Sequence, residues 1–407
     1  MNILVLNCGS SSVKYKLISM TNETLLAHGV IERIGTVNAL LNHWCGDDIH
    51  IKKVCEILNH SKGIEKVIEM LLAPECGTLK KITDVKAVGH RVVHGGDKFS
   101  GSVLINNEVK AMIRDCIDLA PLHNPHNFRG INAIDEILPG VPQVASFDTA
   151  FHQTLPDFSY LYGLPYSEYL KHSIRRYGFH GTSHRYVSYR AAKLLKKSIN
   201  KLKIITCHLG NGASITAVDK GKSVDTSMGF TPLEGLVMGT RCGDIDPAIV
   251  TYLASKMGMT IVEVDNLLNK HSGLLGLSGI SNDMRELIKS VNEGSDRANL
   301  ALSVYCYRIK KYIGAYVASL NGFDALVFTA GVGENSAYIR EKICSDMDFF
   351  GIKIDKNKNN KMIDGKEGLI SRFRSKVPIM VIPTNEELLI ARDTKTIVDS
   401  LKIKDKK

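Results

Sequence analysis

The sequence of 407 residues contains no apolar run that approaches the ~20 residues needed to cross a bilayer, so we expect no membrane-spanning helix. It also lacks any C-x-x-C pair. Its nine cysteines are odd in number and scattered, which favours reduced thiols over a disulfide framework or a zinc ribbon. The opening segment, MNILVLNCGSSS, has no basic region and no cleavage site, so we expect no secretory signal peptide. Together these absences predict a cytoplasmic protein.

Two common nucleotide-binding motifs are missing as well. The sequence has no G-x-x-x-x-G-K-[ST] segment, and it has no G-x-G-x-x-G segment. The first absence argues against a P-loop protein and the second against a dinucleotide-binding fingerprint. Any nucleotide site must therefore be built from other loops.

The composition is that of an ordinary globular protein, with 44% hydrophobic and 23% charged residues. The length suits two domains at roughly 150 residues each. Six of the ten net positive charges fall between Ile352 and Lys407, where 14 Lys/Arg face 8 Asp/Glu. We interpret this excess as solvated surface, with a weaker alternative that it gathers anionic substrates. Because the basic tail, LKIKDKK at 401–407, carries no interleaved aromatic residues, we expect no nucleic-acid partner.

A strand–turn–strand pattern occurs twice. The apolar run ILVL at 3–6 is followed by the polar turn NCGSSS and by the alternating segment VKYKLI at 13–18. The same pattern returns at 203–218 as KIIT, CHLGNGAS and ITAV, which places Gly9 opposite Gly210. The repeat predicts a duplicated α/β domain with a boundary near residue 150.

Helix signals lie between the predicted strands. Ser183 is placed to cap a helix that runs to about Lys197, and Asp246-Pro247 resembles a helix start. Residues 296–320 carry apolar side chains at helical spacing, and they lead to the apolar strand ALVFTA at 325–330. Strands that alternate with helices predict α/β layers around a mostly parallel sheet.

The two glycine and serine turns are candidate phosphate-binding loops. Glycine lets the backbone approach a phosphate closely, and successive N–H groups form a concavity that binds anions. Either turn alone is more typical of an ordinary hairpin than of a phosphate site. Two turns at matching places, the first followed by Lys14, favour a shared nucleotide. A third glycine turn, GVGENS at 331–336, precedes a helix predicted to start at Ala337.

Two arginines lie in glycine-rich segments. Arg91 belongs to HRVVHGGDKFSGS, and Arg241 belongs to the long stretch DTSMGFTPLEGLVMGTRCGDIDP. A stretch so poor in helix and strand formers is typical of a functional loop. A surface position is the alternative, but an arginine buried among such residues needs an anionic partner.

Several other polar residues allow two interpretations. His180 and His184 have the i, i+4 spacing of zinc-binding helices, but Gly181 and the capping Ser183 separate them, which argues against a metal there. Asp148 follows the apolar run VASF, as an active-site carboxylate or a helix cap would. Glu386 and Glu387 follow VPIMVI, where they either bind Mg²⁺ or cap the next helix.

Taken together, ten segments resemble the acetate kinase family, in the superfamily of acetate and sugar kinases, Hsp70 and actin. They occur in family order. The segments are LNCGSSSVKYKL, GHRVVHGG, PLHNP, FDTAFHQT, RYGFHGTSHRYV, CHLGNGAS, DTSMGFTPLEGLVMGTRCGDIDP, SGISNDMR, AGVGENS and PTNEEL. Ten motifs in order are far more specific than any one of them.

The resemblance implies an α/β fold of two duplicated RNase H-like (actin-like ATPase) domains with a central cleft. It implies a first domain of residues 1–150, completed by a C-terminal helix at about 385–407, and a second, nucleotide-binding domain of residues 151–384. It also implies a homodimer. The implied activity is reversible phosphoryl transfer between ATP and acetate, giving ADP and acetyl phosphate. Mg²⁺ is the implied ion, with Mn²⁺ as an alternative.

The resemblance also assigns roles to residues of this sequence. The implied catalytic residues are Arg91, His123, Asp148, His180 and Arg241, with Arg91 also binding the substrate. The implied acyl pocket is formed by Val93, Leu122, Phe179 and Pro232, for each of which plain packing is the alternative. The implied nucleotide-binding residues are Lys14, His208, Leu209, Gly210, Asn211, Gly212, Asp283, Met284, Arg285, Gly331, Val332, Gly333, Glu334 and Asn335. Asn7 and Glu386 are the implied metal ligands.

Elementary electrostatics fits these assignments. A carboxylic acid is already ionised at pH 7, so the acceptor needs no general base. The difficulty is the repulsion between two anions, which is ~1 kcal/mol for unit charges ~4 Å apart in water and larger near a protein. Arginines, histidine donors and a cation address that difficulty. We therefore expect Asp148 to orient Arg91 or a metal-bound water instead of abstracting a proton.

Two alternative functions stay open at this stage. One is an acyl kinase that prefers propionate or butyrate, because a methylene group changes affinity by only ~1–3 kcal/mol. The other is a non-catalytic actin-like module that binds ATP. Such a module needs the phosphate loops, but it has no use for a second cationic site made by Arg91, Arg241 and His180.

Overall fold

The computed structural model describes residues 1–46, 49–76 and 78–404. The chain folds into two compact units, which are described one at a time. The first unit comprises Met1–Phe151 and Asn385–Lys407, and the second comprises His152–Thr384. The end of the basic tail, residues 405–407, lies outside the described residues.

The first unit is built on a sheet with the strand order β5-β4-β3-β2-β1-β6-β8-β7. Its strands are β1 (Asn2–Cys8), β2 (Ser12–Ser19), β3 (Thr24–Glu32), β4 (Thr36–Cys45), β5 (Ile49–Ile57), β6 (Val85–Val92), β7 (Val103–Leu104) and β8 (Gln143–Phe147). Its helices are α1 (His60–Leu72), α2 (Asn107–Asp115), α3 (Asn124–Ile137) and α15 (Glu386–Lys404).

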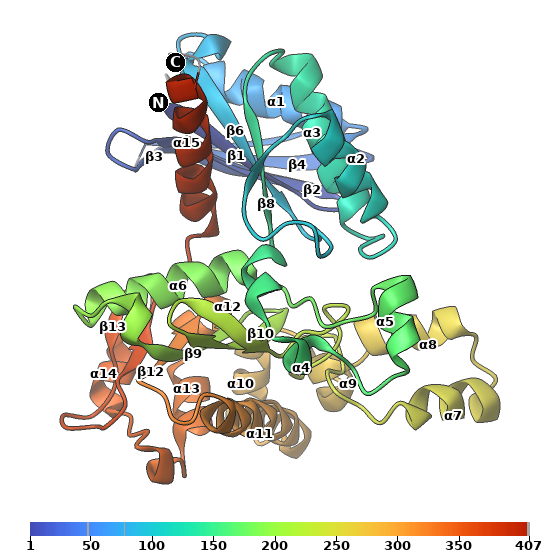
Figure 1. Ribbon diagram of the computed structural model, residues 1–407, viewed down its shortest axis with the longest axis vertical. Helices are drawn as coiled ribbons and strands as arrows, with labels where there is room; N and C mark the ends of the chain where they lie inside the picture. Colours follow the sequence, from blue (N-terminus) through green and yellow to red (C-terminus); the bar gives the residue numbers. More distant parts are fainter. Residues whose placement is uncertain (47–48, 77, 405–407) are drawn as a thin grey trace. The chain divides into compact units, whose positions relative to one another are not determined.

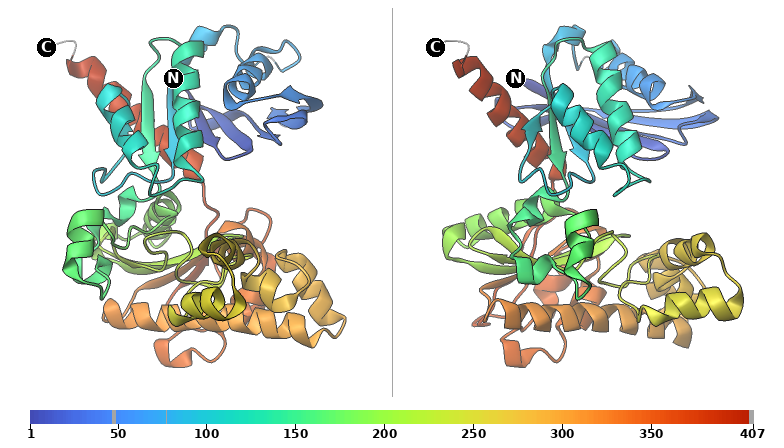
Figure 2. Two further views of the ribbon diagram at one scale, coloured as in Figure 1. Left: turned by 90° about the vertical axis from the view of Figure 1, so that its right-hand side faces the viewer. Right: turned by 45° about the vertical axis from the view of Figure 1, so that its right-hand side comes forward.

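Both faces of this sheet are covered, which explains why β1 is apolar without alternation. Ile3 and Val5 pack on Ile390 and other residues of α15. Leu4 and Leu6 point to the other face, where they pack with Ile64 of α1 and with residues of α3. Figures 1 and 2 show α15 on one side of the sheet and α1 with α3 on the other. A strand buried on both faces has no position for an exposed polar side chain.

Glycine at position 89 of β6 allows α15 to approach the sheet. A Cβ atom at Gly89 would lie 2.6 Å from Cγ2 of Ile390 and 2.7 Å from Oγ1 of Thr394. Both distances are too short for non-bonded atoms, so a side chain here would push the helix away. The C-terminal helix is thereby attached to a unit whose other elements come from the first 151 residues.

The second unit has a sheet with the order β11-β10-β9-β12-β14-β13. Its strands are β9 (Lys203–Leu209), β10 (Ala213–Asp219), β11 (Lys222–Thr226), β12 (Ala325–Thr329), β13 (Gly368–Leu369) and β14 (Ile379–Val381). Its helices are α4 (Asp157–Tyr160), α5 (Tyr166–His172), α6 (Gly181–Leu194), α7 (Ala248–Met257), α8 (Ile261–Lys270), α9 (Gly273–Ser278), α10 (Met284–Asn292), α11 (Asp296–Ser319), α12 (Ala330–Asn335), α13 (Ala337–Cys344) and α14 (Lys356–Lys361). Helices α6 and α11 cover opposite faces of this sheet (Figure 1).

The predicted repeat is present in the strand order. In the first unit β1 pairs antiparallel with β2 and parallel with β6, and in the second β9 pairs antiparallel with β10 and parallel with β12. The α/β prediction is confirmed, but the mostly parallel sheet is wrong. Among the described strands, parallel pairing is limited to β1-β6-β8 and β9-β12-β14. The polar turns after β1 and β9 are short hairpins, which can only join antiparallel strands.

Most predicted helix boundaries agree with the structure to within a residue or two, but Ser183 is an exception. Helix α6 begins at Gly181, with His180 as its N-cap, so Ser183 lies inside the helix. Its hydroxyl instead contacts Nδ1 of His208 at 2.8 Å. The predicted serine cap was therefore wrong, because the helix begins two residues before Ser183.

One cysteine pair departs from the prediction of reduced thiols. Cys45, at the end of β4, forms a disulfide with Cys76, which follows α1, and their Cα atoms are 5.8 Å apart. The pair is 31 residues apart in sequence and is brought together only by the packing of α1 beside β4 and β5. The other seven cysteines are free. Spacing along the chain gave no indication of this contact.

No helix within residues 1–46, 49–76 and 78–404 is long and apolar enough to cross a membrane.

Candidate active site

Polar residues of the first unit gather where its parallel strands end. Asn7 lies near the end of β1, Arg91 near the end of β6, and Asp148 directly after β8. The ends of parallel strands meet at one edge of a sheet, and β1, β6 and β8 are neighbours. Lys14 joins this edge from β2, because it pairs with Asn7 in the β1–β2 register. Four predicted site residues therefore lie together.

Asp148 holds Arg91 through two hydrogen bonds. Nε of Arg91 donates to Oδ1 of Asp148 at 2.9 Å, and Nη2 donates to Oδ2 at 2.6 Å. Nη1 of Arg91 also donates to Oδ1 of Asn7 at 3.4 Å. The carboxylate is 1% exposed, whereas the arginine side chain keeps 25% of its surface. Such a two-point contact fixes the plane of the guanidinium group and leaves one edge of it accessible.

Two glutamates at the start of α15 complete this cluster. Glu387 forms an ion pair with Lys16 at 2.9 Å. The pKa of Glu386 is raised to about 7, chiefly by burial; the charge of Arg91 opposes this shift and the charge of Asp148 adds to it. A carboxylate in this situation gains from a neighbouring cation. The amide oxygen of Asn7 and the carboxylates of Asp148 and Glu386 are the hard oxygen donors that suit Mg²⁺.

The remaining predicted residues of the first unit lie around α3. His123 is the N-cap residue of α3, and Leu122 before it is 62% exposed. Val93 is buried, and its N–H donates to Oδ1 of Asn127 at 3.0 Å. The side chain of Val93 is therefore packed inside this unit, whereas the side chain of Leu122 is accessible to a ligand.

In the second unit, three histidines are ordered by hydroxyl groups. Nδ1 of His180 and Nε2 of His184 each lie 2.8 Å from Oγ of Ser214 on β10. The ring of His208 stacks on that of His180, with their centroids 4.0 Å apart. His184 is fully buried, and burial lowers its pKa well below the usual value. Both ring nitrogens of His184 are engaged by hydroxyl groups, because its Nδ1 also lies 2.7 Å from Oγ1 of Thr206.

His180 is held in an unusual backbone conformation beside the glycine turn. Its φ of 56° lies in the left-handed region, which non-glycine residues adopt rarely. A Cβ atom at Gly212 would lie 3.6 Å from the His180 ring and 3.4 Å from Nη1 of Arg241. The glycine turn, His180 and Arg241 therefore meet at one place. Three separate motifs of the sequence come together there.

Arg241 is partly buried without a carboxylate partner in the described chain. Its Nη1 donates to the carbonyl of Pro232 at 3.4 Å and contacts Sδ of Met238 at 3.8 Å. Burial lowers the pKa of the guanidinium group, and no neighbouring charge offsets that effect. A buried cation whose contacts are only a carbonyl and a thioether is suited to bind an anionic ligand.

A cavity of about 700 Å³ adjoins the glycine turn. This volume lies in the usual range for sites that bind small molecules, ~300–1,000 Å³. Eight of the predicted nucleotide-binding residues line it, namely Gly210, Asn211, Asp283, Met284, Arg285, Gly331, Val332 and Asn335. These eight residues come from three of the motifs, CHLGNGAS, SGISNDMR and AGVGENS, which are far apart in sequence.

Other predicted nucleotide-binding residues lie outside the lining. Leu209 is fully buried, and His208 is 8% exposed. Oε1 of Glu334 accepts from the N–H groups of Ala330 at 2.7 Å and Thr384 at 3.1 Å, so this side chain braces the loop. Lys14 belongs to the other unit.

The cavity also uses residues that sequence reasoning missed, namely Gly239, Leu274, Asn282, Ile288, Ser336 and Asp364. Ile288 follows Met284 by one helical turn on α10, so helical spacing gives a signal for it. Asn282 lies within the motif SGISNDMR. Asp364 lies in the basic segment Ile352–Lys407 that we interpreted as surface, and no local signal marks it.

The fold and the site define an α/β protein of two units, one with a cluster of carboxylates around Arg91 and one with a cavity of the size that binds small molecules. Comparison with known proteins gives the particular family. A sequence model described as the acetokinase family matches residues 2–392, and the chain belongs to that family. This agrees with the resemblance seen in the ten motifs.

Individual relatives cover nearly the whole chain. An acetate kinase of Acetivibrio thermocellus is 57% identical over 98% of this chain and 100% of the relative. The crystal structure of Porphyromonas gingivalis acetate kinase is 50% identical, with a TM-score of 0.94 over 98% of this chain and 99% of its own. That of a propionate kinase from Francisella tularensis is 47% identical, with a TM-score of 0.91 over 97% and 99%.

Proposed function

We propose that this protein is an acetate kinase, which transfers the terminal phosphoryl group of ATP reversibly to acetate. The oxygen of the acetate carboxylate forms a bond to the γ-phosphorus while the bond from that phosphorus to the β,γ-bridging oxygen breaks. The products are acetyl phosphate and ADP. The proposal accords with family membership and with relatives named acetate kinase at 57% identity over nearly the full chain.

One observation carries the chemical part of the proposal. Arg241 lies next to Gly212 and His180, beside the cavity, with no carboxylate to neutralise it among the described residues. A cation placed there stabilises negative charge on a phosphoryl group that leaves the nucleotide. Ser214 orients His180 for the same purpose, because its Oγ lies 2.8 Å from Nδ1 of His180 and the ring faces Gly212.

The cluster of the first unit supplies the second half of the chemistry. Arg91, oriented by Asp148, binds the carboxylate of acetate. Asn7 and Glu386 hold Mg²⁺, with Mn²⁺ as the alternative, and the ion neutralises phosphate charge when bound. Asp148 accepts two hydrogen bonds from Arg91 and acts as a positioning residue. The proposal requires that both clusters serve the same transfer.

A methyl group is the acyl substituent that we propose for the main substrate. The residues proposed to contact it are Val93 and Leu122 of the first unit and Phe179 and Pro232 of the second. A propionate kinase among the structural relatives motivates the comparison with a longer acid. Because one methylene group is worth only ~1–3 kcal/mol, we expect propionate to react at a lower but measurable kcat/KM.

A hydroxamate assay tests this function. Acetyl phosphate reacts with hydroxylamine to give a coloured hydroxamate, and acetate, propionate and butyrate are compared at fixed Mg-ATP. We expect kcat/KM to fall in that order. A higher kcat/KM for propionate or butyrate would identify an acyl kinase of different preference. ATP binding without any hydroxamate would favour the non-catalytic alternative.

We further propose that the protein acts as a homodimer in the cytoplasm, where ATP and acetate meet. Sedimentation equilibrium at micromolar concentration tests the oligomeric state. A mass of 44.9 kDa would correspond to the monomer and would contradict this part of the proposal.

A further inference from the structure

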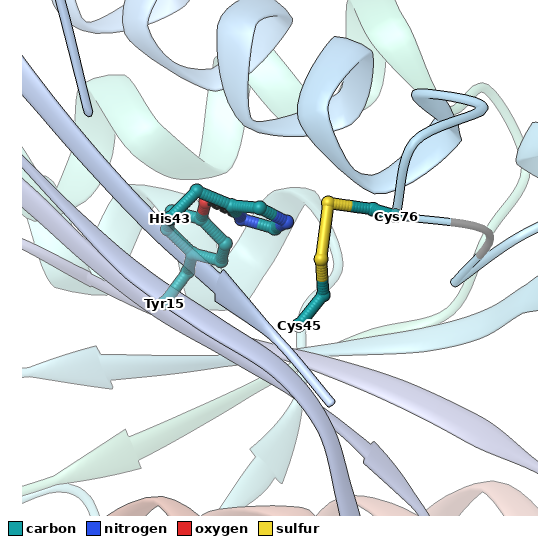
Figure 3. The surroundings of a disulfide bond; sticks show 4 residues. All are labelled: Tyr15, His43, Cys45 and Cys76. Atoms are coloured by element: carbon teal, nitrogen blue, oxygen red, sulfur yellow. Dashed lines mark hydrogen bonds between the residues drawn. A yellow bond between two sulfur atoms is a disulfide. The ribbon is translucent and has the colours of Figure 1, made fainter. Parts of the chain in front are cut away.

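A small cluster of histidine and cysteine side chains in the first unit takes no part in the candidate active site described above. It consists of His43 and Cys45 on β4 and Cys76 after α1 (Figure 3). One ring nitrogen of His43 and the two sulfur atoms all lie within 4.8 Å of one another. Among the described residues, no other group of three histidine, cysteine or acidic side chains is so close.

The histidine of this cluster has a buried nitrogen without a hydrogen bond. His43 is fully buried, and its Nε2 has no hydrogen-bond partner in the described chain. A buried polar atom without a partner costs roughly 1–3 kcal/mol. Figure 3 shows this side of the ring turned towards the sulfur atoms of Cys45 and Cys76. A disulfide is a poor acceptor, so the oxidised pair does little to satisfy this nitrogen.

The other nitrogen of His43 is already oriented. Its Nδ1 forms a hydrogen bond with the hydroxyl of Tyr15 on β2, and the two rings stack with centroids 5.8 Å apart. Histidines that bind metals are commonly fixed in this way, with one nitrogen held by an outer hydrogen bond and the other facing the ion. The position of His43 therefore does not depend on the sulfur atoms.

We propose that His43, Cys45 and Cys76 bind one zinc ion when the disulfide is reduced. A dithiol reductant supplies two electrons and two protons, the S–S bond breaks to give two thiols, and the reductant is oxidised to its own disulfide. Zinc then binds Nε2 of His43 and the two sulfurs, and the two thiol protons are released. Cys76 is only half-buried, which gives the ion a route of entry and leaves water as the fourth ligand.

The spacing suits this ion. Zn–S bonds of about 2.3 Å and Zn–N bonds of about 2.0 Å place tetrahedral ligand atoms roughly 3.5–3.8 Å apart. The three ligand atoms already lie within 4.8 Å of one another, so binding needs the two sulfurs to separate after reduction and the nitrogen–sulfur distances to adjust by about 1 Å at most. Two thiolates and one imidazole favour zinc over Mg²⁺, which prefers oxygen ligands.

The test uses untagged full-length protein, reduced with dithiothreitol and freed of reductant and metal under nitrogen. Co²⁺ or Zn²⁺ is then added in excess Mg²⁺, which occupies oxygen sites. We expect one ion per chain and the strong near-ultraviolet absorption of thiolate bound to Co²⁺. Protein left oxidised should show seven reactive thiols after unfolding, against nine when reduced, and it should not bind the ion.

Variants separate this site from other thiols. Cys76→Ser should abolish the cobalt absorption, whereas Cys55→Ser, at a half-buried thiol on the adjacent strand β5, should leave it unchanged. Reduced wild-type protein without that absorption would overturn the proposal and leave a structural disulfide. An unchanged signal in Cys76→Ser would overturn it too. Because wild-type protein alone gives a decisive result, poor folding of a variant does not remove the test.

Discussion

At the residue scale, the most informative contact is the one between Arg91 and Asp148. The sequence left Asp148 between an active-site carboxylate and a helix cap. The structure places it directly after β8, with both oxygens on Arg91 and with its side chain almost wholly buried. This geometry favours a role in positioning the guanidinium group over a role in proton transfer.

Replacing Asp148 by Asn tests that role. Asn offers one acceptor oxygen instead of two and carries no charge, so Arg91 is held less firmly. We expect Asp148→Asn to lower kcat ~100-fold or more, the cost typical of an electrostatic contribution of this kind. The pH–rate profile should keep its shape. Loss of the acidic limb, with no recovery of activity at high Mg²⁺, would instead identify Asp148 as a proton acceptor.

Buried histidines make stability depend on pH. Burial lowers the pKa of His90 and of His152 to about 4, whereas an unfolded histidine titrates near 6.5. Between these values the unfolded chain binds the extra proton, so stability is retained above pH 6.5 and is lost as the pH falls towards 4. Each residue contributes a loss on the order of 2 kcal/mol at pH 5.

Urea unfolding at pH 7.5 and pH 5.0 measures this effect. His90→Gln removes one titrating group and keeps a donor for Oε1 of Gln143, to which Nε2 of His90 lies at 2.8 Å. We expect a smaller difference between the two pH values in this variant than in the wild type. Equal differences would mean that His90 does not contribute.

At the scale of elements, the apolar patterns were reliable. The strands around 3–18 and 203–218 and the long helix α11 were predicted because each is a local pattern of burial. The prediction of mostly parallel strand pairing was wrong, since the direction of pairing depends on which strands become neighbours. Helix α12 was missed for a related reason. Its sequence AGVGEN is rich in glycine and forms a helix only where β12 ends against the cavity.

The close packing of α15 against β6 at Gly89 predicts that a side chain added at this position destabilises the fold. In Gly89→Ala the new methyl group would meet Ile390 and Thr394, so the helix must shift. We expect a loss of ~1–3 kcal/mol in the free energy of unfolding, as is usual for an overpacked interior. Gly101→Ala is the matched control, because a Cβ atom there meets nothing within 4 Å. Similar urea midpoints for both variants would contradict this reading of the packing.

At the scale of the whole molecule, the candidate residues fall into two groups on two units. Arg91, Asp148, Asn7 and Glu386 belong to the first, and Arg241, His180 and the cavity belong to the second. The resemblance carried by the ten motifs implied both groups, and the motifs stand out because seven of them contain glycine and all carry polar residues. They could not predict the cavity wall at Asp364 or the Cys45–Cys76 contact, since both depend on packing between distant segments.

A double-mutant cycle on Arg91 and Arg241 tests most directly whether the two groups serve one reaction. The measurement is kcat/KM for acetate with Arg91→Ala, Arg241→Ala and the double variant. If both cations stabilise one transition state, each single change should cost ~100-fold or more, and the double loss should be smaller than the product of the two. Losses that simply multiply, or an undiminished kcat/KM in either single variant, would contradict the account.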